Sequence, residues 1–343
     1  MHIALRYKPY DFSPGTSCLI PGSKYAIKAY PTAFFLFSET EELGSIHLDF
    51  KGLVKDFVVM QDLENYKVYI SGFALSGFFC FVFYEELGEL WLKLERGPIE
   101  GLHVEAYFGN DQSVFFLLPK EKKKLFKQPL PSKQIVFEKI SFGSHKALDW
   151  TKIQKRRDPK EYLPLWYALA QSSLFSTQNT SKELLPFSLE RCEELFVGFF
   201  EGMMLPKTHS APYLGLGNEK NRDKNKFFDL SLLSGVHQMI RSTLFIQNGG
   251  VTEILPNLPS SFDSGRALNM QGNGAVFDLE WSKKTIKKLK ITVFQEQTFC
   301  FSFQKGLKSF RIKADHDKNR QRYFCEDAVE LQPGFYLLDQ FQK

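Results

Sequence analysis

The sequence predicts a multidomain α+β protein with an N-terminal antiparallel β-sandwich, a short helical region and a C-terminal β-sandwich. Three observations predict this order. Short apolar and aromatic runs broken by turn formers come first, helical spacing of apolar residues follows, and strict apolar–polar alternation returns at the end. The domains are therefore expected at residues 1–142, 143–250 and 251–343. A chain of 343 residues is long enough to build two or three separate cores.

Residues 1–142 are expected to form strands. Their apolar runs recur at spacings of roughly eight to twelve residues, which is typical of an antiparallel sandwich. These runs include "TAFFLFSE", "SIHLDF", "KDFVVMQD", "ELWLKLERG" and "QIVFEKISF". No long helical pattern interrupts them, so this part is expected to be all-β.

The central region is expected to contain a small number of helices. Asp158 can cap a helix that begins at Pro159, and Glu161 can close a capping box. A second helix is indicated by apolar residues at alternating steps of three and four: Leu189, Cys192, Phe196, Phe199 and Met203.

A third helix is expected over "DLSLLSGVHQMIRSTLFI", with Asp229 as a candidate N-cap. It is expected to stop at the Asn-Gly-Gly of residues 248–250, where a left-handed C-cap is easy. His237 falls within the apolar stripe of this helix, which favours a buried or bordering histidine over a ligand. From residue 251 the period returns to two, as in "KKLKITVF" and "TFCFSFQKG", which indicates sheets with one buried face.

Composition excludes several classes of function. A net charge of +5 is small for this length and does not indicate nucleic acid. The longest apolar stretch, residues 72–84, is too short to span a bilayer, and no secretory signal is visible, so a cytoplasmic location is expected. The five cysteines form no CxxC pair, which leaves no basis for a zinc site or a disulfide framework. No cofactor is therefore expected.

Residues 229–291 carry a family resemblance. The matching positions are Leu255, Pro256, Leu258, Pro259, Phe262, Gly265, Asp278 and Trp281. They form a Leu-Pro-x-Leu-Pro turn, followed by an aromatic residue, a glycine and a strand ending in acid-x-Trp. This pattern resembles the junction between the helical barrel and the C-terminal β-domain in glycoside hydrolase family 95, the α-L-fucosidase type. The resemblance implies a carbohydrate-active protein with its active site in a helical barrel.

The helical region is shorter than that family requires. A ring of twelve average helices needs roughly 200 residues or more, whereas the predicted region spans 143–250. The expectation is therefore a partial α/α-barrel-like region in a degenerate relative. Asp229 is the loose counterpart of the family's Phe-x-x-Asp-Gly-Asn segment, but the Gly-Asn is missing here.

Glu201 and Asp229 are the candidate catalytic residues. Glycoside hydrolysis needs two carboxyl groups across one bond, and the acid should lie in an apolar pocket. Glu201 follows an apolar run, and Gly202 could end the helix and turn the carboxyl group into a cleft. The alternative for Glu201 is a surface glutamate, and the alternative for Asp229 is a simple N-cap.

The stretch "HKALDWTKIQKRRDP", residues 145–159, contains candidate substrate-binding residues. Trp150 could stack on a sugar ring, with His145, Asp149 and Arg157 beside it. The alternative is a domain linker pinned by ion pairs and anchored by Trp150. Two further binding candidates, His209 and Tyr213, lie in a Pro- and Gly-rich loop, and long loops often carry sites.

Two functions stay open from the residues alone. The first is a protein that binds or hydrolyses a glycan in a cleft between the helical region and the β-domains. It predicts either Glu201 beside a second carboxylate, or an exposed Trp150 or Tyr213. The second is a non-catalytic interaction protein that forms a homodimer or binds another protein through its helical face. It predicts exposed side chains at Phe196, Phe199 or Phe200.

Overall fold

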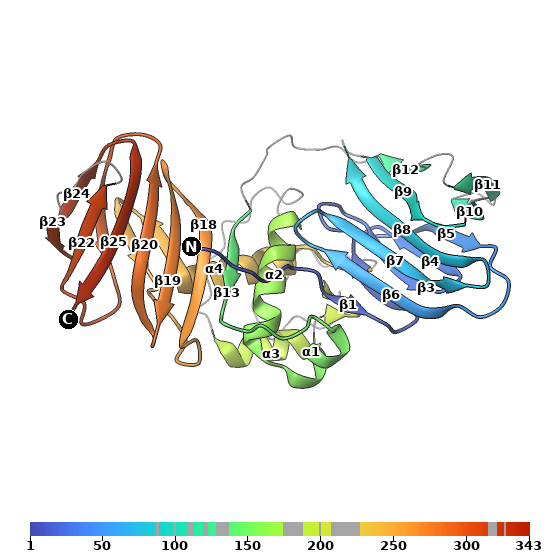
Figure 1. Ribbon diagram of the computed structural model, residues 1–343, viewed down its shortest axis with the longest axis horizontal. Coiled ribbons are helices and arrows are strands. Elements are labelled where there is room, and N and C mark those ends of the chain that lie inside the picture. The colour runs from blue at the N-terminus through green and yellow to red at the C-terminus, as the bar shows by residue number, and fades with distance from the viewer. Residues whose placement is uncertain are drawn as a thin grey trace.

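The computed structural model shows two β-rich parts with helices between them (Figure 1). The structure describes residues 1–86, 89–98, 101–108, 113–118, 123–127, 137–173, 188–198, 200–206, 227–314, 321–325 and 327–343. The predicted order of β, short α and β is confirmed at this level, and antiparallel sheets dominate the chain.

The N-terminal part contains two antiparallel sheets, each with six strands in the described residues. One has the order β1-β6-β7-β8-β9-β12: β1 Tyr10–Asp11, β6 Lys55–Asp62, β7 Lys67–Ala74, β8 Gly77–Glu86, β9 Glu89–Arg96 and β12 Lys123–Lys127. The other has the order β11-β10-β5-β4-β3-β2: β11 Ser113–Leu118, β10 Leu102–Phe108, β5 Glu42–Leu48, β4 Ala33–Phe37, β3 Ala26–Tyr30 and β2 Thr16–Leu19.

Phenylalanine rings hold these two sheets face to face. Phe34 of β4 lies with its ring centroid 5.3 Å from Phe81 and 5.4 Å from Phe83, both on β8. All three side chains are fully buried. Aromatic pairs of this edge-to-face kind add stabilisation beyond the area they bury. Some of the 35 phenylalanines in the sequence therefore fill this core.

Four helices are present in the described residues: α1 Trp150–Arg156, α2 Pro159–Ser173, α3 Leu189–Gly198 and α4 Ser231–Leu244. As predicted, Pro159 is the first residue of a helix. Residues 161–172 of α2 are buried throughout, so this helix is surrounded by protein and packs against α4. A small hairpin of β14 Phe200–Glu201 and β15 Leu205–Pro206 follows α3.

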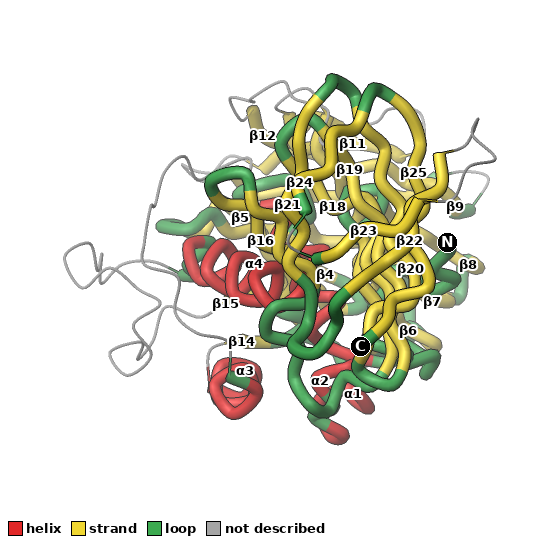
Figure 2. The backbone as a smooth tube through the Cα atoms, turned by 90° about the vertical axis from the view of Figure 1, so that its left-hand side faces the viewer, coloured by secondary structure: helices red, strands yellow, loops and turns green. Residues whose placement is uncertain are grey.

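The described helices do not form a closed ring. Figure 2 shows them grouped towards one side of the molecule. In the described part of the chain, no helix combines the length and the apolar character needed to cross a bilayer.

The C-terminal part also has two sheets. The seven-stranded sheet has the order β13-β18-β19-β20-β25-β22-β23: β13 Lys139–Ser141, β18 Ser264–Gly272, β19 Ala275–Ser282, β20 Thr285–Val293, β25 Gly334–Gln342, β22 Ser309–Ala314 and β23 Gln321–Phe324. The four-stranded sheet has the order β16-β17-β21-β24: β16 Phe245–Asn248, β17 Val251–Ile254, β21 Gln297–Ser302 and β24 Ala328–Leu331. Phe277 of β19 contacts Phe245 and Phe299 across the interface.

Two predicted boundaries need correction. Residues 139–141 belong to the C-terminal sheet, because β13 pairs with β18 rather than with the N-terminal sandwich. The third helix ends at Leu244, and the chain continues as β16. The glycines of the Asn-Gly-Gly segment, Gly249 and Gly250, have φ values of 55° and 88° and turn β16 into β17, so they close a hairpin and not a helix.

Candidate functional site

The two predicted catalytic carboxylates lie on the β14–β15 hairpin and in the segment that hydrogen-bonds to it. Glu201 pairs with Leu205, and its side chain is exposed to solvent. The backbone N–H of Asp229 donates to the carbonyl of Pro206 at 3.3 Å. One carboxylate oxygen of Asp229 accepts from the N–H of Ser231 at 3.0 Å, at the start of α4. Glu201 therefore lacks the apolar surroundings that the acid role requires. Asp229 is not the N-cap that the sequence predicted, because the N-cap of α4 is Leu230, without a side-chain capping hydrogen bond, and Asp229 lies one residue before it.

The stretch that begins at His145 forms a capped helix. Asp149 is the N-cap of α1, accepts from the N–H of Lys152 at 3.1 Å and pairs with the Lys152 ammonium at 2.9 Å. His145 is exposed just before it. Arg157 is the left-handed C-cap, with φ of 50°, and lies 4.0 Å from Glu193. The alternative interpretation, a linker pinned by ion pairs, fits these contacts.

Trp150 is a buried anchor, which corrects the expectation of an exposed stacking surface. Only 1% of the residue is exposed. Its indole N–H donates to the carbonyl of Gly202, and its ring lies 5.7 Å from that of Phe196. No face of the indole is left for a sugar ring.

The remaining predicted residues divide into two groups. His209 and Tyr213 lie outside the described residues. Of the phenylalanines that an exposed helical face requires, Phe196 and Phe200 are each 7% exposed, and Phe199 lies outside the described residues. The helical surface expected for a partner is therefore not found at Phe196 or Phe200. The homodimer stays a prediction.

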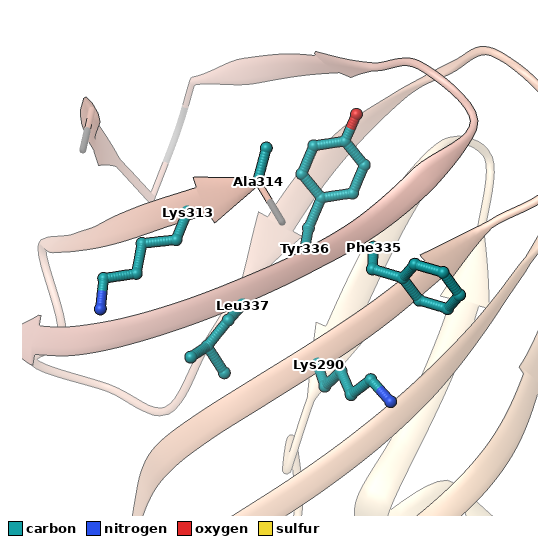
Figure 3. A pocket seen from close by; sticks show the side chains of 6 residues that line it. All are labelled: Lys290, Lys313, Ala314, Phe335, Tyr336 and Leu337. Carbon is teal, nitrogen blue, oxygen red and sulfur yellow. The ribbon is translucent and has the colours of Figure 1, made fainter. Parts of the chain in front are cut away.

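The structure instead shows a groove on the outer face of the seven-stranded sheet (Figure 3). Its volume is about 540 Å³, within the range of small-molecule sites. The lining residues come from β20, β25 and β22: Lys290, Lys313, Ala314, Phe335, Tyr336 and Leu337.

Strand alternation and register build this groove. Leu337 of β25 pairs with Lys290 of β20 on one side and with Lys313 of β22 on the other, so the three form one row across the sheet. The neighbouring row, Leu289, Leu338 and Ile312, points into the core and is buried. The row containing Leu337 must therefore face outward.

Phe335 gives the groove an exposed aromatic surface. It lies two positions before Leu337 on β25 and is 51% exposed. The Lys290 ammonium lies 5.7 Å from its ring centroid, within the range of a cation–π contact. Figure 3 shows Tyr336 pointing to the opposite side of the strand from Leu337, and its hydroxyl donates to the carbonyl of Gln332 at 2.9 Å.

The residues of this groove were not among the candidates from the sequence. The alternation in "KKLKITVF" does place Lys290 on a polar face. However, Lys290, Lys313 and Leu337 meet only because β20, β25 and β22 are neighbours. No local sequence pattern predicts that order of strands.

A second cluster of polar side chains is buried where the helices meet the C-terminal sheet. Glu138, 5% exposed, accepts from the hydroxyl of Tyr167 on α2, from the N–H of Gln271 on β18 at 2.7 Å, and from the guanidinium of Arg241 on α4 at 3.3 Å. Gln171 exchanges two hydrogen bonds of 2.7 Å with the Glu138 backbone. Because both carboxylate oxygens have donors, we interpret this cluster as a structural junction.

His237 belongs to the same junction and is buried, in agreement with the expectation for it. It is 8% exposed and stacks on Tyr167 with the ring centroids 4.4 Å apart. Among the described residues its Nε2 has no hydrogen-bond partner. Burial lowers the pKa of His237 to about 4, with Arg241 acting in the same direction and Glu138 in the opposite one.

This histidine predicts a loss of stability in acid. The unfolded chain takes up a proton near the ordinary histidine pKa of about 6.5, whereas the folded chain resists it until about pH 4. The stability that neutral His237 confers is therefore complete above about pH 6.5 and is lost as the pH falls from about 6.5 to about 4. The free energy of unfolding should drop by about 3 kcal/mol more in the wild type than in His237→Phe between about pH 7 and pH 4. Urea titrations at several pH values measure this difference, and parallel curves for the two proteins would contradict it.

Among the described residues, no three His, Cys, Asp or Glu side chains come together in a way that could hold a metal ion. Comparisons with protein-family models and with curated proteins found no match to this chain.

Proposed function

We propose that the protein binds carbohydrate without cleaving it, through the groove lined by Phe335, Leu337, Lys290 and Lys313. The observation that carries the proposal is an exposed aromatic ring in a groove of about 540 Å³ on a rigid sheet. An aromatic face offers an apolar surface to the C–H side of a sugar ring, while flanking polar groups bind its hydroxyls. The resemblance of residues 229–291 to a glycosidase family supports the same ligand class.

Binding is favoured over hydrolysis by the positions of the carboxylates. Cleavage needs two carboxyl groups about 5–5.5 Å or roughly 6.5–9.5 Å apart across the bond. The six lining residues include no carboxylate. Glu201 is exposed on a separate hairpin, and Asp229 is engaged at the start of α4. A partial α/α-barrel that has lost its active site would account for this arrangement.

A glycan array with the wild type and Phe335→Ala tests the proposal. We expect the wild type to bind a defined set of glycans, and we expect the variant to bind them about tenfold more weakly because the aromatic surface is lost. Phe73→Ala is the matched control, because Phe73 is 49% exposed on a strand of the other sandwich. Equal binding by all three proteins would place the site elsewhere.

Turnover is tested separately with aryl glycosides. We expect no cleavage by the wild type or by Glu201→Gln. Cleavage by the wild type that is abolished in Glu201→Gln would overturn the proposal and support the hydrolase hypothesis instead.

A further inference from the structure

We infer that the carbohydrate recognised by the groove is anionic, carrying carboxylate or sulfate groups that meet Lys290 and Lys313. The inference rests on the proposed function and adds the ligand class to it.

The two lysines are placed on either side of an apolar floor. Lys290 and Lys313 both pair with Leu337, one from each neighbouring strand. Two strand spacings separate their backbones by about 10 Å. Both side chains line the groove, with Leu337 between them. A ligand lying along Leu337 and Phe335 would therefore pass between two ammonium groups.

Nearby acids cancel only part of the positive charge around the groove. Arg311 binds both carboxylate oxygens of Asp339, at 2.8 and 3.0 Å, and Lys313 reaches Asp339 only at 3.7 Å. Two cations thus share one carboxylate, which leaves an excess positive charge beside the groove.

Lys290 supplies a second positive charge. Among the described residues it forms no ion pair, and its contact is with the ring of Phe335. Asp278 lies opposite Lys290 in the strand register and accepts from the N–H of Asn269 at 2.9 Å, with no ion pair to Lys290. With Asp278 and Asp339 both counted, Lys290, Arg311 and Lys313 still leave one positive charge in excess. The groove therefore offers an apolar floor of Leu337 and Phe335 with a cationic group on either side, which suits an oligomer of acidic sugars better than a neutral one.

Isothermal titration with matched hexasaccharides tests this inference. The probes are a neutral glucan, an oligouronate and a sulfated oligosaccharide, and an oligonucleotide serves as a non-sugar polyanion. We expect the acidic sugars to bind about tenfold more tightly than the neutral one, as two partly exposed ion pairs allow. We expect this advantage to shrink in high salt. The stronger of the two acidic ligands identifies the anionic group.

The lysine variants assign that advantage to the groove. Lys290→Met and Lys313→Met keep most of the length of the side chain and remove its charge. Each is expected to weaken acidic binding about three- to fivefold and to weaken neutral binding less, because only the acidic ligand loses an ion pair. Lys55→Met, an exposed lysine on β6, is the control.

The outcomes separate the two proposals. Equal affinity for neutral and acidic sugars, with Phe335→Ala still weakening both, would overturn the inference and leave the proposed function standing. Acidic binding that is unchanged in both lysine variants would also overturn it. Binding of the oligonucleotide as strong as that of the acidic sugars would show a general polyanion surface and overturn it as well. Absence of binding to every sugar would end both proposals.

Discussion

Replacing Glu138 by alanine is expected to lower the free energy of unfolding by about 3–5 kcal/mol. The substitution leaves the Arg241 guanidinium without its carboxylate. The Glu138 side chain is 6% exposed and the Arg241 side chain 26%. It also removes the acceptor of the Tyr167 hydroxyl and of the Gln271 N–H. Arg241 keeps its hydrogen bond to the carbonyl of Gln271, but a partly buried charge that loses its carboxylate costs more than the ion pair contributes, because part of its hydration is lost without compensation. Chemical denaturation monitored by circular dichroism measures this loss.

A double-mutant cycle separates the ion pair from the cavity. Glu138→Gln keeps the shape of the side chain, and Arg241→Met keeps much of the length of its partner. If the pairing matters, the loss in the double variant should be smaller than the sum of the two single losses, with a coupling energy of about 1–3 kcal/mol. Strict additivity would show that the two side chains contribute independently.

The junction around Glu138 joins the central helices to the C-terminal sheet. It connects α2 through Tyr167 and Gln171, α4 through Arg241, and the C-terminal sheet through Gln271. None of these contacts could be predicted from the sequence, because Glu138 is 103 residues from Arg241 and 133 from Gln271. A glutamate in a strand-like run has no local mark that distinguishes it from a surface residue.

The fold was predictable where the pattern is local. Alternation in "KKLKITVF" fixes which side of β20 is buried, and Pro159 fixes the start of α2. The errors lie at positions decided by distant partners. Lys139–Ser141 follows the N-terminal run of strands in sequence but pairs with β18. Phe245–Asn248 continues the apolar stripe of α4 but leaves the helix to pair with β17.

The candidate site was predicted poorly for a related reason. Charged and aromatic residues that are dense in sequence, as at Asp149, Trp150 and Arg157, mark a helix with its two caps and a buried anchor. The groove residues Lys290, Lys313 and Phe335 are scattered in sequence and ordinary in their local context. Their common feature is the outer face of three neighbouring strands, which depends on the order β20-β25-β22.

The second large effect is expected at Gly265, in the segment that resembles the glycosidase junction. A Cβ atom at this position would lie 2.2 Å from the indole of Trp281 and 2.3 Å from the backbone carbonyl oxygen of Ser141. The indole cannot retreat easily, because its N–H donates to the carbonyl of Phe262 at 3.1 Å and Trp281 is 1% exposed. Gly265→Ala should therefore push β13 away from β18 and cost about 3 kcal/mol or more.

Gly198→Ala is the control for this substitution, because a Cβ there meets nothing within 4 Å and its φ lies outside the left-handed range. Its effect should stay within about 0.5 kcal/mol. Thermal unfolding compares the two variants, and hydrogen exchange at Ile140, whose backbone pairs with Ala267, reports whether β13 has detached. If Gly265→Ala is as stable as Gly198→Ala, Trp281 must have room to move. In that case, the close approach of Gly265, Trp281 and Ser141 does not hold β13 on the C-terminal sheet. β13 is the strand between the N-terminal sandwich and the helices.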